Sequence, residues 1–138
     1  MAGKAILFEE IREGEELPPL QKDVTLVQMV MYAAATWDFG RIHYDKDFVQ
    51  SRGVSQPFVD GQMLGAFLAQ MVTDWVGQQG MLRKLSFQNS GMVFPGDRLR
   101  LEIEVLRARE RGGKIQGKAF VEDDLVAEAE FMFALVER

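Results

Sequence analysis

The chain of 138 residues has no cysteine, one histidine and only four prolines. Without cysteine it can form no disulfide framework, no thiolate metal site and no cysteine nucleophile. A single histidine also argues against a zinc site, because most zinc sites use several histidine or cysteine ligands. We therefore expect no bound metal, and any catalysis must use other groups.

The sequence also lacks an excess of positive charge and a long apolar run. Its net charge of -5 argues against a broad nucleic-acid-binding face, although a local basic patch could still bind the phosphates of a small ligand. No apolar run approaches the roughly 20 residues of a membrane span. The opening MAGKAILFEEIREGEE turns acidic too early for a signal peptide. We expect a cytoplasmic protein that binds neither nucleic acid nor membrane.

The chain does contain enough apolar residues for a core. Hydrophobic residues make up 47% of the sequence and charged residues 27%, which is typical of a folded globular protein. No internal repeat, linker or low-complexity stretch divides it. We therefore predict a single domain over residues 1–138.

Helices are predicted in the first half of the chain, after a short strand. Thr25 and Gln28 have capping-box spacing, and LVQMVMYAAAT then carries apolar residues at helical intervals, which predicts a helix over residues 26–36. Asp45 can cap a short helix in KDFVQSRG that stops at Gly53.

The stretch QMLGAFLAQMVTDWVGQQG predicts a long helix. Its remaining faces carry the small residues Gly65, Ala66 and Ala69, so the helix should be enclosed by other elements, and strands or a partner chain could approach it closely. The apolar stripe consists of Met63, Leu64, Phe67, Leu68, Met71, Val72, Trp75 and Val76.

From about Leu82 onward the apolar period changes to two, as in strands with one buried face. RLRLEIEV, KIQGKAFVE and LVAEAEFMFALVE are separated by RERGG and EDD, which predicts three antiparallel strands joined by hairpins. Before them, LRKLSFQNSGMVF predicts another strand, with a bulge at Gly91 and a turn at PGD. One curved antiparallel sheet wrapped around one helix is the α+β hot-dog fold, whose open sheet edges favour a dimer.

The segment TWDFGRIHYDKDF contains the only histidine. Asp38 and His43 lie five residues apart, and Gly40 between them would allow the chain to fold back and bring carboxylate and imidazole together. Such a pair could take a proton from a water molecule and return one elsewhere. On spacing alone, a structural role in capping and backbone hydrogen bonding remains open.

WDFGRIH resembles the Asp-x-Asn-Pro-x-His signature of the MaoC-like, or (R)-specific, enoyl-CoA hydratases. The resemblance implies that Asp38 and His43 occupy the two catalytic positions. In that family a glycine at the start of the central helix follows the acid by a little over twenty residues, which implies Gly61 in VDGQMLGAFLAQ. MVFPGDRLRLEIEV is similar to the family's strand-turn-strand, so the likeness extends from about Leu26 onward.

The sequence departs from this pattern at three positions. Gly40 and Arg41 replace the Asn and Pro of the signature, and Asp60 replaces a histidine that many members carry before the glycine. Losing proline makes the loop less rigid, and losing asparagine removes an amide. Arg41 could bind a phosphate of coenzyme A or an acyl carboxylate, although a surface role is the simpler interpretation.

The resemblance implies reversible syn addition of water to a trans-2-enoyl thioester, giving an (R)-3-hydroxyacyl product. The N–H of Gly61 would donate a hydrogen bond to the thioester oxygen and stabilise the negative charge that develops there. Coenzyme A enters only as part of the substrate, and no metal or redox cofactor is implied. The chain would act as a homodimer or with a related hot-dog chain.

Two alternatives remain. A hot-dog thioesterase would use a carboxylate on the central helix, but the only acid there is Asp74, late along the helix. A partner subunit that supports a related catalytic chain is the other, and the residues at Gly40 and Arg41 leave it open.

Overall fold

The computed structural model describes residues 10–136. The predicted last strand reached Glu137, which lies outside these residues. The elements in chain order are β1 (Leu20–Asp23), α1 (Leu26–Thr36), the 3-10 turn η2 (Arg41–His43), α2 (Lys46–Ser51), α3 (Gly61–Val76), η3 (Gly77–Gln79), β2 (Gly80–Asn89), β3 (Arg98–Arg109), β4 (Gly112–Val121) and β5 (Asp124–Leu135).

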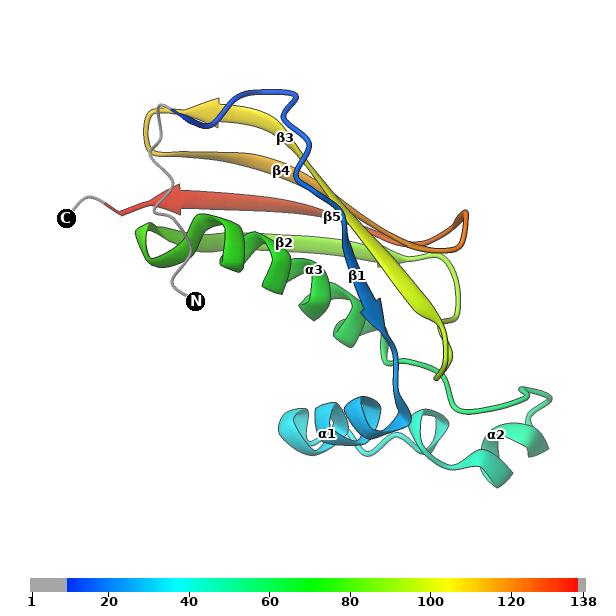
Figure 1. Cartoon of the computed structure of the whole chain (residues 1–138). Coiled ribbons are helices and arrows are strands. Elements are labelled where there is room, and N and C mark those ends of the chain that lie inside the picture. Colours follow the sequence, from blue (N-terminus) through cyan, green and yellow to red (C-terminus); the bar gives the residue numbers. More distant parts are fainter. Residues whose placement is uncertain (1–9, 137–138) are drawn as a thin grey trace.

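The strands form one antiparallel sheet in the order β1-β3-β4-β5-β2. The sheet is curved, and α3 lies along one of its faces (Figure 1). This arrangement confirms the predicted hot-dog fold. Strand β2 forms one edge of the sheet, and the four-residue β1 forms the other.

The core lies between α3 and the sheet. The alternation predicted for β3 is confirmed, because Leu99, Leu101 and Val105 are fully buried while Arg98 is exposed. The stripe of α3 packs against them, and Leu68 on that stripe is likewise fully buried. Apolar burial on this scale is the main term that holds α3 on the sheet.

The small residues of helix α3 led us to expect that other elements enclose it, but residues 10–136 do not enclose it on all sides. Gln62, Ala66 and Thr73 are exposed, because the sheet covers only one side of the helix in a single chain. The small residues do permit a close approach of a strand. A Cβ on Gly65 would lie 3.0 Å from the ring of Phe87 in β2.

Strand β2 ends at Asn89, earlier than predicted. Its register is irregular between Leu82 and Lys84, which was not predicted. Beyond Asn89 two residues, Ser90 and Gly91, oppose the single residue Val126, which is the β-bulge arrangement predicted at Gly91. After Asn89 the N–H groups of both Ser90 and Gly91 donate to the same carbonyl, that of Val126. The chain then leaves β5, and the next buried residue, Val93, bonds to the loop before α3 instead.

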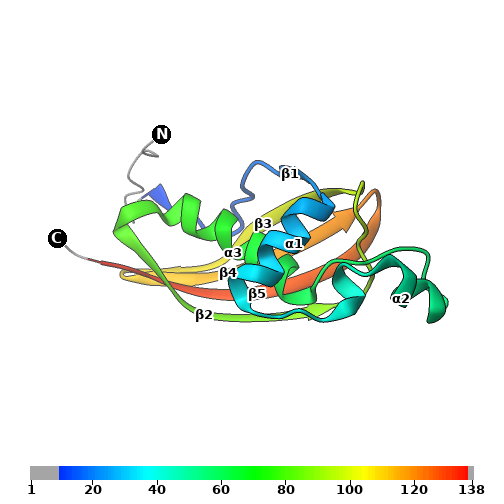
Figure 2. The ribbon, with the colours of Figure 1, turned by 90° about the horizontal axis from the view of Figure 1, so that it is seen from below.

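Residues 24–60 form a helical segment beyond the N-terminal end of α3, and Figure 2 shows α1 and α2 on that side of the molecule. Both side-chain bonds of the predicted capping box are present, between Thr25 and Gln28 at 3.1 and 3.2 Å. Asp45 caps α2 as predicted, and Gly53 follows its end with a φ of +82°. Within residues 10–136, no helix is long and apolar enough to cross a membrane.

Candidate active site

The segment after α1 turns back at Gly40. Trp37 ends the helix in the left-handed conformation, with a φ of 59°, and the carboxylate of Asp38 then accepts the N–H of Gly40 at 3.2 Å. A Cβ on Gly40 would lie 3.4 Å from Asp38 Oδ1 and 3.4 Å from Cδ2 of His43. The structure therefore brings the two predicted side chains to the same side of Gly40.

The ring of His43 is held in one orientation. Its Nδ1 lies 2.8 Å from the carbonyl oxygen of Phe58. A carbonyl can only accept, so Nδ1 carries a proton and Nε2 is the nitrogen that can exchange one. The Phe58 N–H donates back to the carbonyl of Ile42 at 3.3 Å, and the Phe58 ring meets the imidazole edge-on. Residues 58–60 thus tie His43 to the start of α3.

Gly61 is the first residue of α3, as predicted. Asp60 caps the helix and its Oδ1 accepts the N–H of Gln62 at 2.8 Å, which gives a structural reason for an acid at this position. Among residues 10–136, no acceptor contacts the N–H of Gly61. This N–H is one of the unpaired donors at a helix start, where the helix dipole favours negative charge.

Asn89, at the end of β2, packs against Gly61. A Cβ on Gly61 would overlap the side-chain amide nitrogen of Asn89 and lie 3.1 Å from its Cγ. Gly61 does not have a left-handed φ, so the lack of a side chain serves this close approach and not a turn. Asn89 was not predicted from the sequence, because it lies in a strand and its contact with α3 is long-range.

Tyr32 on α1 is a second residue that was not predicted from the sequence. Burial raises the pKa of its phenol above 10.0, and the negative charges of Asp60 and Asp38 raise it further. Tyr32 therefore stays neutral within electrostatic reach of the predicted acid and of the α3 cap. No spacing rule marks it, since it belongs to the apolar pattern of α1.

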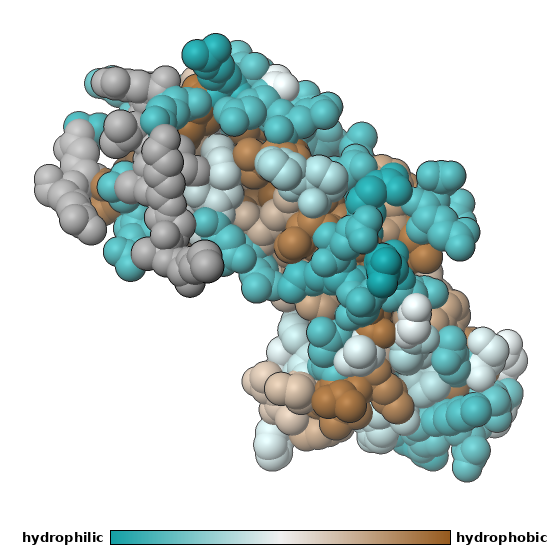
Figure 3. Space-filling model, in the orientation of Figure 1, coloured by the Kyte–Doolittle hydropathy of each residue, from teal (hydrophilic) through white to brown (hydrophobic). Residues whose placement is uncertain are grey.

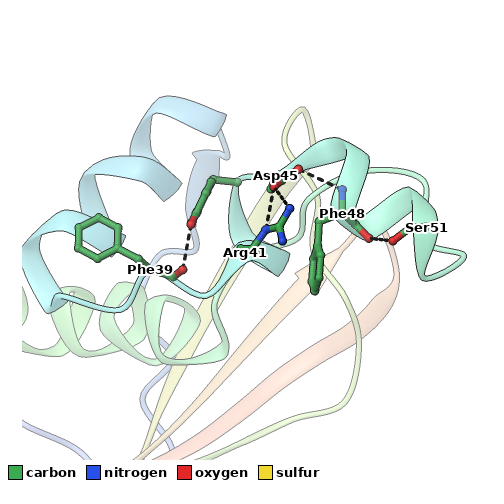
Figure 4. A network of polar contacts seen from close by, with 6 residues as sticks. Phe39, Arg41, Asp45, Phe48 and Ser51 are labelled. Carbon is green, nitrogen blue, oxygen red and sulfur yellow. Dashed lines mark hydrogen bonds and ion pairs between the residues drawn. The ribbon is translucent and has the colours of Figure 1, made fainter.

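Arg41 is engaged in local contacts. Its Nε and Nη2 donate to Oδ2 of Asp45 at 2.9 and 2.7 Å, and its guanidinium lies over the ring of Phe48 (Figure 4). The N–H of Phe48 and then Arg41 hold the pKa of Asp45 below 3.8. These contacts account for Arg41 without a ligand, and its predicted contact with substrate stays a prediction.

The surroundings of the pair are apolar and open. Trp37 is 82% exposed and meets the ring of Phe39 edge-on, while Asp38 itself is exposed. Apolar residues gather on the lower part of the molecule, where α1 lies (Figure 3). Val27 and Met31 of α1 are among the most exposed of them. In an isolated chain the pair therefore faces solvent.

Asp74, the acid that a thioesterase would need, lies at the opposite end of α3. It is exposed and stands about 20 Å along the helix from Gly61, at the usual rise per residue. It therefore cannot act on a substrate bound between Asp38, His43 and Gly61.

Residues 10–127 match the family model described as MaoC like domain. The chain belongs to the MaoC-like family. The resemblance that WDFGRIH suggested is thereby confirmed. The catalytic roles of Asp38 and His43 are not tested by this match and stay predictions.

Among curated proteins, the MaoC-like chain is similar to 3-hydroxyacyl-acyl-carrier-protein dehydratases. It is 56% identical over 46 residues to FabZ of Geobacillus thermodenitrificans, which covers 33% of this chain and 32% of that protein. It is 38% identical over 96 residues to FabZ of Moorella thermoacetica, and this match covers 60% of this chain and 64% of that protein. The chain thus matches about a third of the first relative's length and less than two thirds of the second's.

Solved structures show the same fold. The (R)-hydratase from A. caviae involved in PHA biosynthesis has a TM-score of 0.84 and 21% identity, over 94% of this chain and 99% of that one. R-hydratase PhaJ1 from Pseudomonas aeruginosa has a TM-score of 0.87 and 17% identity, over 95% of this chain and 86% of that one. A chain of the ChsH1-ChsH2 complex from Mycobacterium tuberculosis has a TM-score of 0.84 and 20% identity, over 90% of this chain and 98% of that one.

Proposed function

We propose that this MaoC-like protein is a hydro-lyase that adds water reversibly to a trans-2-enoyl thioester, giving an (R)-3-hydroxyacyl thioester. The observation that supports it most is the placement of Asp38 and His43 on one side of Gly40, with Nε2 of His43 available for proton exchange. Membership of the MaoC-like family supports the same class of reaction.

The two side chains share the proton transfers. One water molecule lies between the Asp38 carboxyl and Nε2 of His43, and loses a proton to one of them as its oxygen attacks the β-carbon. The electrons of the double bond move toward the thioester oxygen, which the N–H of Gly61 stabilises. The other group of the pair then gives a proton to the α-carbon, so that hydration leaves the pair's total proton count unchanged.

The thioester is carried by coenzyme A in this proposal, as in the hydratases that WDFGRIH resembles. The curated relatives are named for acyl-carrier-protein substrates, which makes the carrier the point to test. Crotonyl-coenzyme A and crotonyl-acyl-carrier protein present the same reacting atoms on two carriers. Faster turnover of the coenzyme A ester is expected, and the reverse preference would assign the chain to carrier-protein substrates.

The reaction is tested by following the enoyl absorbance of a crotonyl thioester. Hydration removes this absorbance without releasing a thiol, whereas a thioesterase releases one. Asp38→Asn and His43→Ala should each lower turnover by about 10² to 10⁴-fold, the usual contribution of a general acid or base. Asp74→Asn, at the far end of α3, is the matched control and should keep wild-type turnover. Thiol release by the wild type would reject the proposal.

The protein acts in this proposal as a homodimer or together with a related hot-dog chain. Two structural neighbours are complexes of unlike chains, ChsH1-ChsH2 and HadBC, both from Mycobacterium tuberculosis. A supporting role without catalysis predicts a different result. In that case Asp38→Asn and His43→Ala would leave the turnover of a reconstituted pair unchanged.

A further inference from the structure

The contact between Asn89 and Gly61 joins the end of β2 to the first turn of α3. Phe87 and Asn89 both point from β2 toward the helix, where Gly65 and Gly61 leave room for them. The Asn89 amide lies so close that a single added methyl group at Gly61 would overlap it. The glycine at the helix start is thus fitted to the asparagine.

The side-chain amide of Asn89, an exposed residue, forms no hydrogen bond with any residue between 10 and 136, although its backbone pairs with Ala127 in the sheet. Its nitrogen lies where a Cβ of Gly61 would stand, and the N–H of Gly61 also lacks an acceptor in this range. Two neighbouring donors at one helix start, neither bonded to an acceptor within residues 10–136, are suited to one shared oxygen.

We propose that the side-chain amide of Asn89 is a second donor to the thioester oxygen of the substrate, acting together with the N–H of Gly61. This inference rests on the proposed hydratase function and adds a catalytic residue to it. As the hydroxyl oxygen bonds to the β-carbon, electrons shift onto the thioester oxygen, and two donors stabilise that charge more than one. No bond to Asn89 is made or broken.

The role requires a donor and not merely a side chain of this size. Leucine has the same branched arrangement of heavy atoms as asparagine but donates nothing, and aspartate has its shape but offers negative oxygens to a negative transition state. Asn89→Leu should lower kcat by about 10 to 100-fold with little change in KM, because an interaction made mainly in the transition state is lost. Asn89→Asp should lower kcat further.

The matched control is Gln88→Leu. Gln88 is the preceding residue of β2 and points to the opposite face of the sheet, so the same kind of substitution there should leave kcat unchanged. A spectroscopic signal separates donation from packing. The carbonyl stretch of a bound, unreactive acyl thioester should shift to higher frequency in Asn89→Leu, since the carbonyl loses a donor, and should not shift in Gln88→Leu.

The contact itself is tested by thermal melts, which do not depend on activity. Gly61→Ala should lower the melting temperature, because the added methyl group meets Asn89. The same substitution made in an Asn89→Ala chain should be neutral or stabilising, since the obstructing amide is gone. Equal effects in both chains would show that the two residues do not touch, which would overturn the proposal.

These experiments distinguish failure of the proposed role of Asn89 from failure of the proposed hydratase function. A wild-type protein that hydrates crotonyl thioesters, together with an Asn89→Leu variant that keeps its kcat and carbonyl frequency, would overturn the role of Asn89 and leave the hydratase intact. A folded wild-type protein that hydrates neither carrier's thioester would overturn the hydratase, and the donor role with it.

Discussion

Asp45 shows how a carboxylate beside the predicted site can serve the fold. It accepts the N–H of Phe48 at 3.0 Å and the guanidinium of Arg41, and both contacts favour its charged form. Its pKa is therefore lowered, so its contribution to stability is present above the unfolded value and is lost as pH falls through the folded one.

This predicts an acid-dependent effect of Asp45→Asn. At pH 7 the variant should unfold at a lower urea concentration than the wild type, because asparagine keeps a cap but loses the ion pair. The difference should disappear once Asp45 itself is protonated, below pH 3.8. Titration of the Asp45 carboxyl by NMR gives its pKa directly. Asp74→Asn should show no such loss, and a difference that persists in acid would contradict the assignment.

At the scale of residues, the sequence predicted what depends on short spacing. Asp38 and His43 around Gly40, and Asp45 as a cap, are all local relationships. Asn89 could not be found this way, since its contact with Gly61 spans 28 positions and depends on how β2 packs on α3. Tyr32 was missed for a related reason, because its neighbours come together only in the folded chain.

At the scale of elements, α1 depends on its ends more than on burial. Among its residues only Met29 and Ala33 are buried, whereas α3 buries a wide stripe. Thr25 provides the cap of α1 through both bonds of the capping box. Loss of the N-cap therefore removes a larger share of the interactions that stabilise α1 than loss of the N-cap of α3 would remove from α3.

Thr25→Ala should lower the free energy of unfolding by about 1 kcal/mol, the typical cost of an N-cap. Chemical denaturation measures this value, and amide hydrogen exchange should show faster exchange in α1 than in α3. Thr73→Ala is the matched control, since Thr73 lies on the exposed side of α3 and its hydroxyl donates to the carbonyl of Gln70 in the same helix. Equal losses in the two variants would contradict a special role for the cap.

Elements with a clear period were predicted more accurately than their boundaries. Helix α1 and the alternation of β3 follow the sequence pattern, because a capping box and a two-residue period act locally. The early end of β2 was not predicted. It results from two N–H groups sharing the carbonyl of Val126, which redirects the chain toward the loop before α3. The open side of α3 was also missed, since pattern alone does not say how many layers cover a helix.

At the scale of the whole molecule, the part of the chain that the structure describes, residues 10–136, leaves two surfaces open. Strand β2 forms a ten-residue edge of the sheet, and unpaired strand edges favour association. The exposed apolar face of α1 includes Val27 at 68% and Met31 at 65%, and Trp37, which follows the helix, is also exposed. Apolar surfaces of this kind on a small protein usually mark an interaction site.

We therefore expect the purified protein to form a dimer or larger assembly, measured by sedimentation velocity over a range of concentrations. If the α1 face is buried in that assembly, Met31→Lys should weaken association by placing an unpaired charge there. Met132→Lys is the matched control, because Met132 is 51% exposed on the outer face of β5. Dissociation by Met132→Lys alone would instead place the contact on the outer face of the sheet. A monomeric wild type at micromolar concentration would reject the expectation.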